Sequence, residues 1–210
     1  MKGIIGKKLG MTHVYDDDGT RIPVTVVEAG PCPVLAVRNE QRDGYHALQL
    51  GFGRKQAKNV SNPVRGHLRA AGLSDAPPAI IREIRLDDAP DVEVGDSVKA
   101  DAFETGEFVD VAGQTKGRGF QGVVKRWRFG GGSAGHGAGW SRKPGSIGMC
   151  VNPGHVYKGR KMPGHMGNVR RTVQNLRIVA VRPEENLLLV KGAVPGPRGG
   201  TVMVRSAIKK

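Results

Sequence analysis

A long run without any carboxylate dominates this 210-residue sequence, because no aspartate or glutamate lies between Asp110 and Glu184. Within that run, residues 113–170 hold 16 of the 32 glycines and 11 lysines and arginines, but only eight Leu, Ile, Val or Phe. So few apolar side chains cannot offset the conformational entropy that a glycine-rich chain loses when it folds. A basic linker of this composition is normally poor in aromatic residues, whereas this segment contains Trp127 and Trp140. We therefore expect residues 113–170 to form an extension that a partner orders.

The net charge of +14 is concentrated in the same half of the chain. Residues 1–112 contain 14 lysines and arginines against 17 aspartates and glutamates, whereas residues 113–210 contain 19 against two. Exposed surfaces normally mix both signs, since charges of one sign repel each other. A segment this rich in cations is typical of a protein that binds a polyanion, which leaves RNA, DNA and anionic membrane surfaces as partners.

Short strand patterns flank the basic segment on both sides. Asp18-Gly19 is a hairpin signal between residues 11–15 and 21–27, and Asn62, Pro63 and Gly72 mark the two ends of a short helix. Further strands are expected at residues 34–37, 46–52, 79–86, 107–111, 172–181, 187–190 and 201–204. The pattern predicts a mainly β fold with little helix, in which residues 1–112 and 171–210 form one β-barrel domain and residues 113–170 form a long glycine-rich basic extension.

Nothing in the sequence predicts a membrane or secreted protein. No apolar run approaches the ~20 residues of a membrane-spanning helix, and the apolar stretch near the N-terminus is too short for a signal peptide. Cys32 and Cys150 are too few for a disulfide scaffold. We expect a cytoplasmic protein with reduced cysteines and no membrane partner.

Residues 117–122 match the dinucleotide-binding pattern G-x-G-x-x-G, but their context argues against that function. The pattern requires an acidic residue about 20 positions further on and a surrounding βαβ unit, and the sequence offers neither. Bare glycine backbone beside Lys116 and Arg118 instead suits close approach to phosphates, although a simple glycine bulge in a loop remains an alternative reading.

Catalytic and metal chemistry are not expected in the basic segment. Carboxylate pairs are absent there, which excludes glycosidase-like and two-metal schemes. His136, Cys150, His155 and His165 have none of the usual spacings of zinc ligands. We predict no enzymatic activity, no cofactor, no metal and no small-molecule substrate.

Basic and aromatic residues alternate along the segment, as they do in many RNA-binding proteins, where cations neutralise phosphates and rings stack on unpaired bases. Some of these aromatics are instead expected to pack in a local core, Phe120 most plausibly. The candidate RNA-binding residues are Lys116, Arg118, Lys125, Arg126, Trp127, Arg128, His136, Trp140, Arg142, Lys143, His155, Tyr157, Lys158, Arg160, Lys161, His165, Arg170 and Arg171.

Four segments together resemble a known family. Residues 108–126, with the core T-K-G-R-G-F-Q-G-V-V-K-R, are similar to the signature of large-subunit ribosomal protein L-three. Residues 3–12, 144–148 and 161–167 are also typical of that family, and the resemblance extends over essentially the whole chain.

The resemblance implies a translation-protein-type β-barrel whose extension enters the large-subunit rRNA. It implies binding near the 3′ end of 23S rRNA early in assembly of the 50S subunit, beside proteins L-fourteen and L-nineteen. It also places the extension tip, near residues 146–153, close to the peptidyl transferase centre. The tip residues so implied are Ser146, Gly148, Met149, Cys150, Val151 and Asn152. Many bacterial members carry a methylated glutamine at this tip, but residues 148–152 contain none, so we expect that modification to be absent.

Two other classes of function serve as alternatives. The glycine pattern would suit a nucleotide-dependent enzyme, which should bind NAD or ATP in equilibrium dialysis. The charge alone would suit a protein that compacts DNA or lies on a membrane surface, which competition between rRNA, duplex DNA and anionic vesicles would reveal.

Overall fold

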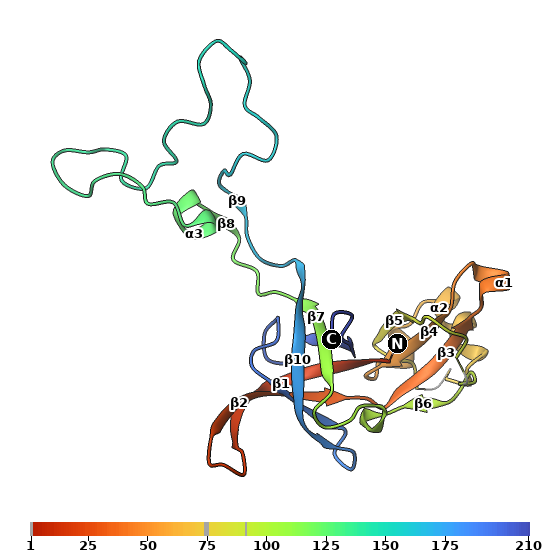
Figure 1. Ribbon diagram of the computed structural model, residues 1–210. Coiled ribbons are helices and arrows are strands. Elements are labelled where there is room, and N and C mark those ends of the chain that lie inside the picture. Colours follow the sequence, from red (N-terminus) through yellow and green to blue (C-terminus); the bar gives the residue numbers. More distant parts are fainter. Residues whose placement is uncertain (1, 74–75, 91) are drawn as a thin grey trace. The chain divides into compact units, whose positions relative to one another are not determined.

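A computed structural model describes residues 2–73, 76–90 and 92–210 and divides the chain into two compact units (Figure 1). Unit 1 comprises Met1–Gln114 and Arg170–Lys210, and unit 2 comprises Thr115–Val169. We call unit 2 the arm. No helix in the described ranges has the length and apolar character needed to cross a membrane.

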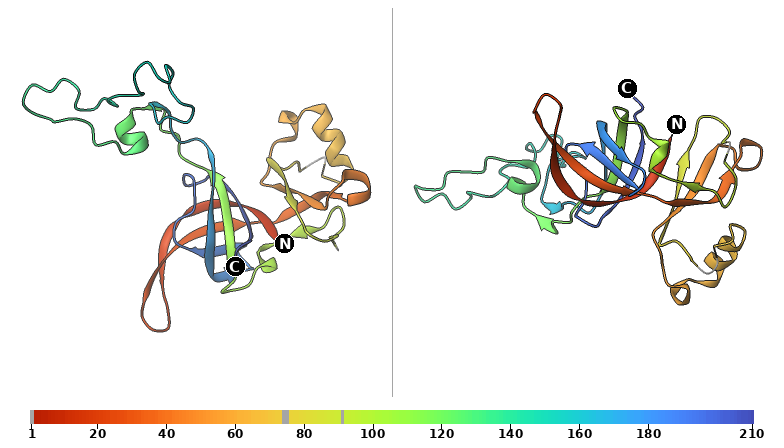
Figure 2. Two further views of the ribbon diagram at one scale, coloured as in Figure 1. Left: turned by 45° about the horizontal axis from the view of Figure 1, so that its top comes forward. Right: turned by 90° about the horizontal axis from the view of Figure 1, so that it is seen from below.

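Six antiparallel strands of unit 1 close into a barrel in the order β1-β12-β7-β10-β11-β2 (Figure 2). The first and last strands of the chain pair with each other, with Gly3 opposite Arg205. The predicted mainly β fold, with a barrel closed from both ends of the sequence, is therefore confirmed. The strands are β1 (Gly3–Tyr15), β2 (Arg21–Ala29), β7 (Phe108–Gln114), β10 (Arg170–Arg182), β11 (Leu187–Lys191) and β12 (Thr201–Ser206).

The barrel interior is filled by apolar side chains that alternate along the strands. Ile4, Val204 and Val111 lie opposite one another on β1, β12 and β7, and all three are fully buried. Leu188 of β11 is buried in the same hydrophobic cluster. Each of these side chains contributes about 1.5–3 kcal/mol on leaving water, which makes this cluster the main source of stability in unit 1.

A second, four-stranded sheet lies within unit 1, in the order β5-β4-β3-β6. All of residues 1–112 were expected to belong to the barrel domain, whereas the described strands within residues 32–98 pair with one another in this separate sheet. Leu50, Ile84 and Phe103 nevertheless share one hydrophobic cluster with the barrel residue Ile5. The strands are β3 (Cys32–Arg38), β4 (Ala47–Phe52), β5 (Ile80–Arg85) and β6 (Ser97–Val98).

Helices are short, as expected. In unit 1 they are α1 (Glu40–Asp43) and α2 (Asn62–Arg69), with single 3-10 turns at Ala57–Asn59 (η1) and Ala100–Ala102 (η2). The predicted helix after residue 61 is confirmed, although Ser61 rather than Asn62 is its N-cap. Gly72 adopts φ +68°, and the amide of Leu73 donates to the Leu68 carbonyl over 3.1 Å, so the helix ends in a glycine-dependent reverse turn.

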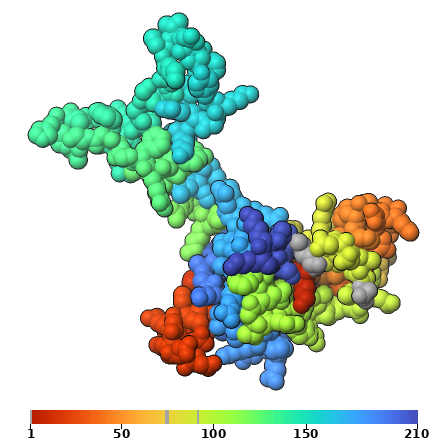
Figure 3. Space-filling view, viewed as in Figure 1, coloured from red at the N-terminus to blue at the C-terminus, as the bar shows by residue number. Residues whose placement is uncertain are grey.

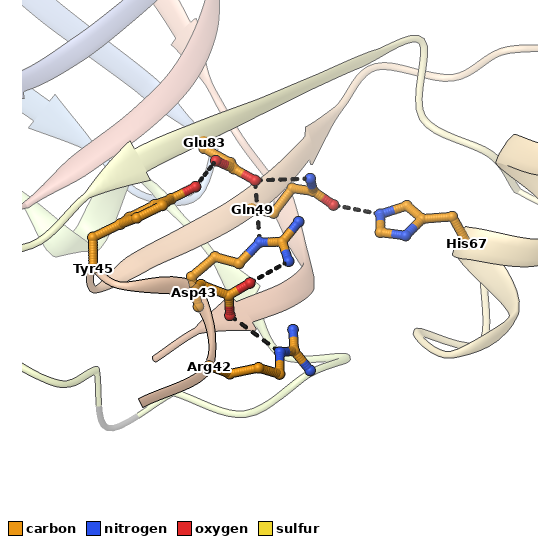
Figure 4. A network of polar contacts seen from close by, with 7 residues as sticks. Arg42, Asp43, Tyr45, Gln49, His67 and Glu83 are labelled. Carbon is orange, nitrogen blue, oxygen red and sulfur yellow. Dashed lines mark hydrogen bonds and ion pairs between the residues drawn. The ribbon is translucent and has the colours of Figure 1, made fainter. Parts of the chain in front are cut away.

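A polar network on the second sheet neutralises part of the acidic charge of unit 1 (Figure 4). Glu83 accepts hydrogen bonds from Arg38, Tyr45 and Gln49 at 3.0–3.3 Å, and Arg38 also bonds Asp43 at 2.9 Å. The hydrogen bond from Arg38 to Glu83 raises the pKa of the Arg38 guanidinium. The hydrogen bond from Tyr45 to Glu83 raises the pKa of the Tyr45 hydroxyl, and partial burial of Tyr45 raises it further. The carboxylates of this network are therefore satisfied within unit 1.

Asp110, the last carboxylate before the arm, is also used within unit 1. It is buried, and one of its oxygens accepts a hydrogen bond of 2.9 Å from the backbone amide of Asn175. Asn175 has φ +57° and lies where the register between β7 and β10 shifts, between Val173 and Leu176. The buried carboxylate thus fixes a bulge in β10, one of the two strands that lead into the arm.

Candidate nucleic-acid interface

The arm begins and ends as two antiparallel segments that hydrogen-bond to each other. The amide of Thr115 donates to the Val169 carbonyl over 3.0 Å, and the amide of Arg118 donates to the Met166 carbonyl over 2.9 Å. The ladder continues into the short pair β8 (Phe120–Gln121) and β9 (Gly164–His165). Backbone pairing therefore gives the arm a defined root, although its composition supplies almost no core.

Gly167 allows the two root segments to approach closely. It adopts φ +75°, and a Cβ at this position would collide with the Lys116 carbonyl oxygen and lie 3.1 Å from the Gly117 Cα. The clash is with backbone, which cannot turn aside as a flexible side chain can.

We expect Gly167→Ala to open the root at a cost of about 1–3 kcal/mol, because it combines a left-handed conformation with a backbone clash. Faster hydrogen exchange of the Arg118 amide would report the opening. Gly148→Ala is the matched control, since a Cβ at Gly148 meets nothing within 4 Å. Equal exchange rates in the two variants would contradict this account.

A short helix, α3 (Val123–Trp127), follows β8 and is held against the returning chain. The Arg126 guanidinium and the Trp127 indole N–H both donate to the Met162 carbonyl, over 2.7 and 2.8 Å. The Arg126 guanidinium lies 5.0 Å from the centre of the Trp127 ring, and the Lys161 ammonium lies 5.7 Å from it. One carbonyl thus holds Arg126 and Trp127 together, and Lys161 adds a second cation over the same ring.

Beyond this point the arm forms two loops, visible as two lobes in Figure 1. The amide of Gly132 donates to the Ser141 carbonyl over 3.0 Å and closes the first loop, in which the Trp140 ring covers Gly132. The Arg160 guanidinium donates to the Ser146 carbonyl over 2.8 Å and closes the second loop. The predicted tip residues, Ser146 to Asn152, all belong to the second loop and are exposed.

The arm has almost no interior. Val123 is the single buried side chain within Thr115–Val169, a range that is described throughout. The space-filling view shows the two loops as thin lobes (Figure 3). Apolar side chains in the second loop lie open, with Met149 76% and Val151 87% exposed. Surface of this kind requires a partner to cover it.

The cations of the arm have no protein counter-charge. In the described ranges the ion pairs join residues of unit 1 only, and the arm contains no carboxylate that its ten lysines and arginines could contact. Sixteen of the candidate RNA-binding residues lie in the arm, where Arg126 alone among them is half-buried and the rest are exposed. Arg170 and Arg171 are the first two residues of β10 in unit 1, and both are exposed.

The glycine pattern at residues 117–122 does not form a dinucleotide site. Its second half is β8, which pairs antiparallel with β9, and the helix that follows has only five residues. Among the described residues, no three His, Cys, Asp or Glu side chains lie close enough together to hold a metal ion.

Comparison with known proteins assigns the family. Residues 85–186 match the family model described as Ribosomal protein L3, and this range contains the whole arm together with β7 and β10. The large ribosomal subunit protein uL3 of Syntrophobacter fumaroxidans is 52% identical over 205 residues, which cover 98% of this chain and 97% of that protein. The protein of the same name from Deinococcus radiodurans is 53% identical over 210 residues, which cover 100% of this chain and 96% of that protein. The chain belongs to the ribosomal protein L3 family.

The geometry of the arm in this L3-family protein corrects one expectation. Phe120 was expected to pack in a local core, whereas it is 76% exposed and is the most exposed aromatic residue of the arm. It lies opposite His165 in the β8–β9 pair, where two residues from each strand are too few to bury a ring. Phe120 therefore joins the aromatic residues available to a partner.

Sequence reasoning also missed the Met162 carbonyl as an organising group of this L3-family arm. A backbone oxygen leaves no signal in a side-chain pattern, and its donors Arg126 and Trp127 were expected to face RNA. The structure gives both side chains a role within the arm and still leaves 38% of Trp127 exposed.

Proposed function

We propose that this protein is a structural, non-catalytic constituent of the large ribosomal subunit in the cytoplasm, and that its arm binds 23S rRNA. The observation that carries the proposal is an exposed arm with ten lysines and arginines, no carboxylate and one buried side chain. Such a segment gains its counter-charge and its packing from a phosphate-rich partner. The relatives named large ribosomal subunit protein support ribosomal RNA as that partner.

The finer parts of the proposal come from the family resemblance. The protein binds near the 3′ end of 23S rRNA early in 50S assembly, with proteins L-fourteen and L-nineteen as neighbours. The second loop of the arm, with Ser146 to Asn152, approaches the peptidyl transferase centre. Exposed Met149 and Val151 support this placement, because a surrounding RNA would remove their apolar side chains from contact with water.

Salt dependence tests the binding mechanism. Each neutralised phosphate contributes about 0.9 to the slope of log affinity against log salt on a B-form duplex, and about 0.7 on single strands. We expect binding to the 3′ domain of 23S rRNA to weaken steeply with salt, and this RNA to outcompete duplex DNA and anionic vesicles. A slope near zero, or equal competition by DNA, would reject the proposal.

The two cysteines test the placement of the tip. Cys150 is exposed, whereas Cys32 is buried and its thiol donates to the Ile5 carbonyl over 3.2 Å. Burial raises the pKa of Cys32 to about 11, so at about pH 8 this thiol carries almost no reactive thiolate. We expect iodoacetamide to label the free protein once, at Cys150.

Within assembled 50S subunits the same reagent should leave Cys150 largely unmodified, because RNA covers the tip. Protein unfolded in guanidinium is the control and should be labelled twice. Rapid labelling of Cys150 in intact subunits would show that the tip is not enclosed.

A further inference from the structure

A cleft on unit 1 is lined by two arginines, Arg82 and Arg170. Its volume is about 290 Å³. One wall consists of β1, β12, β7 and the start of β10, and the other is β5, an edge strand of the second sheet. All of its lining residues belong to unit 1 and to the described ranges.

The floor of this cleft is apolar because of the barrel register. Ile5 lies opposite Met203, and Met203 lies opposite Ala112, so the three side chains form one row across β1, β12 and β7. The adjacent row is buried in the barrel, and side chains alternate between faces, so the row of Met203 is on the outer face. Ile5 and Ala112 of this row are almost fully buried, whereas Met203 is half-buried, so Met203 supplies most of the accessible apolar surface of the floor.

Two arginines stand at the rim of the apolar floor. Arg82 of β5 and Arg170 of β10 are both exposed, and the cleft lining contains no carboxylate. One guanidinium nitrogen of Arg82 donates to the Ile81 carbonyl over 2.9 Å, and one of Arg170 lies 4.0 Å from the Met203 sulfur. These contacts orient the guanidinium groups and leave further N–H donors on each, which suits bidentate binding of phosphate oxygens.

We propose that this cleft binds one unpaired nucleotide of the RNA, with its base on the floor around Met203 and its phosphate between Arg82 and Arg170. The inference rests on the proposed function, since it requires the protein to bind RNA. An apolar floor beside two arginines, in a cleft whose lining contains no carboxylate, matches a base linked to a phosphate. The small volume suits one nucleotide better than a stretch of folded peptide.

The position of the cleft along the chain supports the same partner. Gln114 and Arg170 line it, and they are paired residues of β7 and β10 at the last rung before the arm begins. Two lining residues of the cleft therefore directly flank the arm in the sequence, and RNA is the proposed partner of the arm.

Three variants separate the parts of the proposal. Arg82→Gln/Arg170→Gln removes both cations, and we expect about tenfold weaker binding to the 3′ domain of 23S rRNA, with a salt slope smaller by about 0.7 because one phosphate contact is lost. Thr201→Trp fills the cleft and keeps both arginines, and a similar loss of affinity is expected. Arg54→Gln/Arg69→Gln changes the charge of unit 1 equally, at exposed residues outside the cleft, and should bind within about twofold of the unaltered protein.

The readouts distinguish the failure of this inference from the failure of the proposed function. If the unaltered protein binds no rRNA, both fail. If it binds rRNA and the cleft variants match the Arg54→Gln/Arg69→Gln control, only the cleft inference is overturned. Thermal unfolding of each variant shows whether a weaker affinity reflects loss of the fold. The cleft inference is judged on the RNA affinity of those cleft variants that remain folded.

A crosslink identifies the occupant directly. With p-benzoylphenylalanine in place of Ile80, in the β5 wall of the cleft, irradiation of assembled 50S subunits should attach the protein to 23S rRNA. An adduct with another ribosomal protein, or no adduct with RNA, would overturn the proposal.

Discussion

Replacing the arm Thr115–Val169 by an Asn-Gly turn is expected to leave unit 1 folded and to remove tight binding to 23S rRNA. Gln114 and Arg170 lie directly opposite each other at the end of β7 and β10, so a two-residue hairpin turn joins them without altering the register. The deletion removes one buried side chain, Val123, and ten of the 33 lysines and arginines. We expect at least a hundredfold loss of affinity at moderate salt, because each lost phosphate contact lowers the salt slope by about 0.7–0.9.

Filter binding and thermal unfolding would measure the two effects separately. A charge-only control keeps the arm and replaces Lys125, Arg142, Lys143 and Lys158 by glutamine, at exposed positions whose side chains form no hydrogen bond or ion pair with another described residue. It should lose affinity and salt slope in part. An unfolded deletion variant would show that the arm stabilises unit 1, and unchanged RNA affinity would place the binding surface elsewhere.

The opposite result is expected for Leu188→Ala, which should destabilise unit 1 by about 2–5 kcal/mol. Leu188 is fully buried in the barrel cluster, and its truncation removes apolar contacts and leaves a cavity. Urea unfolding followed by far-UV circular dichroism would measure the loss. Tryptophan fluorescence would not report on unit 1, because both tryptophans lie in the arm.

Ile208→Ala is the matched control, because Ile208 is 63% exposed beyond the end of β12 and should cost less than about 0.5 kcal/mol. Below the unfolding transition, the Leu188→Ala protein should still bind rRNA, since the arm is unchanged. Equal destabilisation by both substitutions would mean that the cluster around Leu188 is not the core of the fold.

The strands of unit 1 were largely predictable because each one carries a local signal. Asp18-Gly19 marked the β1–β2 hairpin, and alternating apolar residues marked β4. The pairing of the strands was harder to predict, because the sequence pattern of one strand does not show which other strand it pairs with. Residues 32–98 therefore seemed to belong to the barrel, although their strands form a separate sheet. The helix α3 was missed because five residues, ending at Arg128 with φ +61°, are too few to show a helical period.

In the arm, the charge pattern predicted the class of partner but not the local geometry. Long-range electrostatic attraction between the arm and a polyanion depends on how many cations the arm carries, and that number can be counted in the sequence. The arrangement of Arg126 and Trp127 around one backbone carbonyl depends on where the returning chain lies, which no side-chain pattern encodes. Phe120 was misjudged for the same reason, since its burial depended on a partner strand that contributes only two residues.

The pairing of β1 with β12 constrains the order of events during synthesis. Strand β1 leaves the translating ribosome first, but one of its neighbours is completed about 190 residues later, at about 5–20 residues per second. Between the completion of β11 and that of β12, the barrel remains open along β1 and β7, while the arm is already made and able to meet RNA. A nascent chain halted between β11 and Thr201 would therefore carry a complete arm on an open barrel. The edges of β1 and β7 would be unpaired in this form, which makes it prone to aggregate.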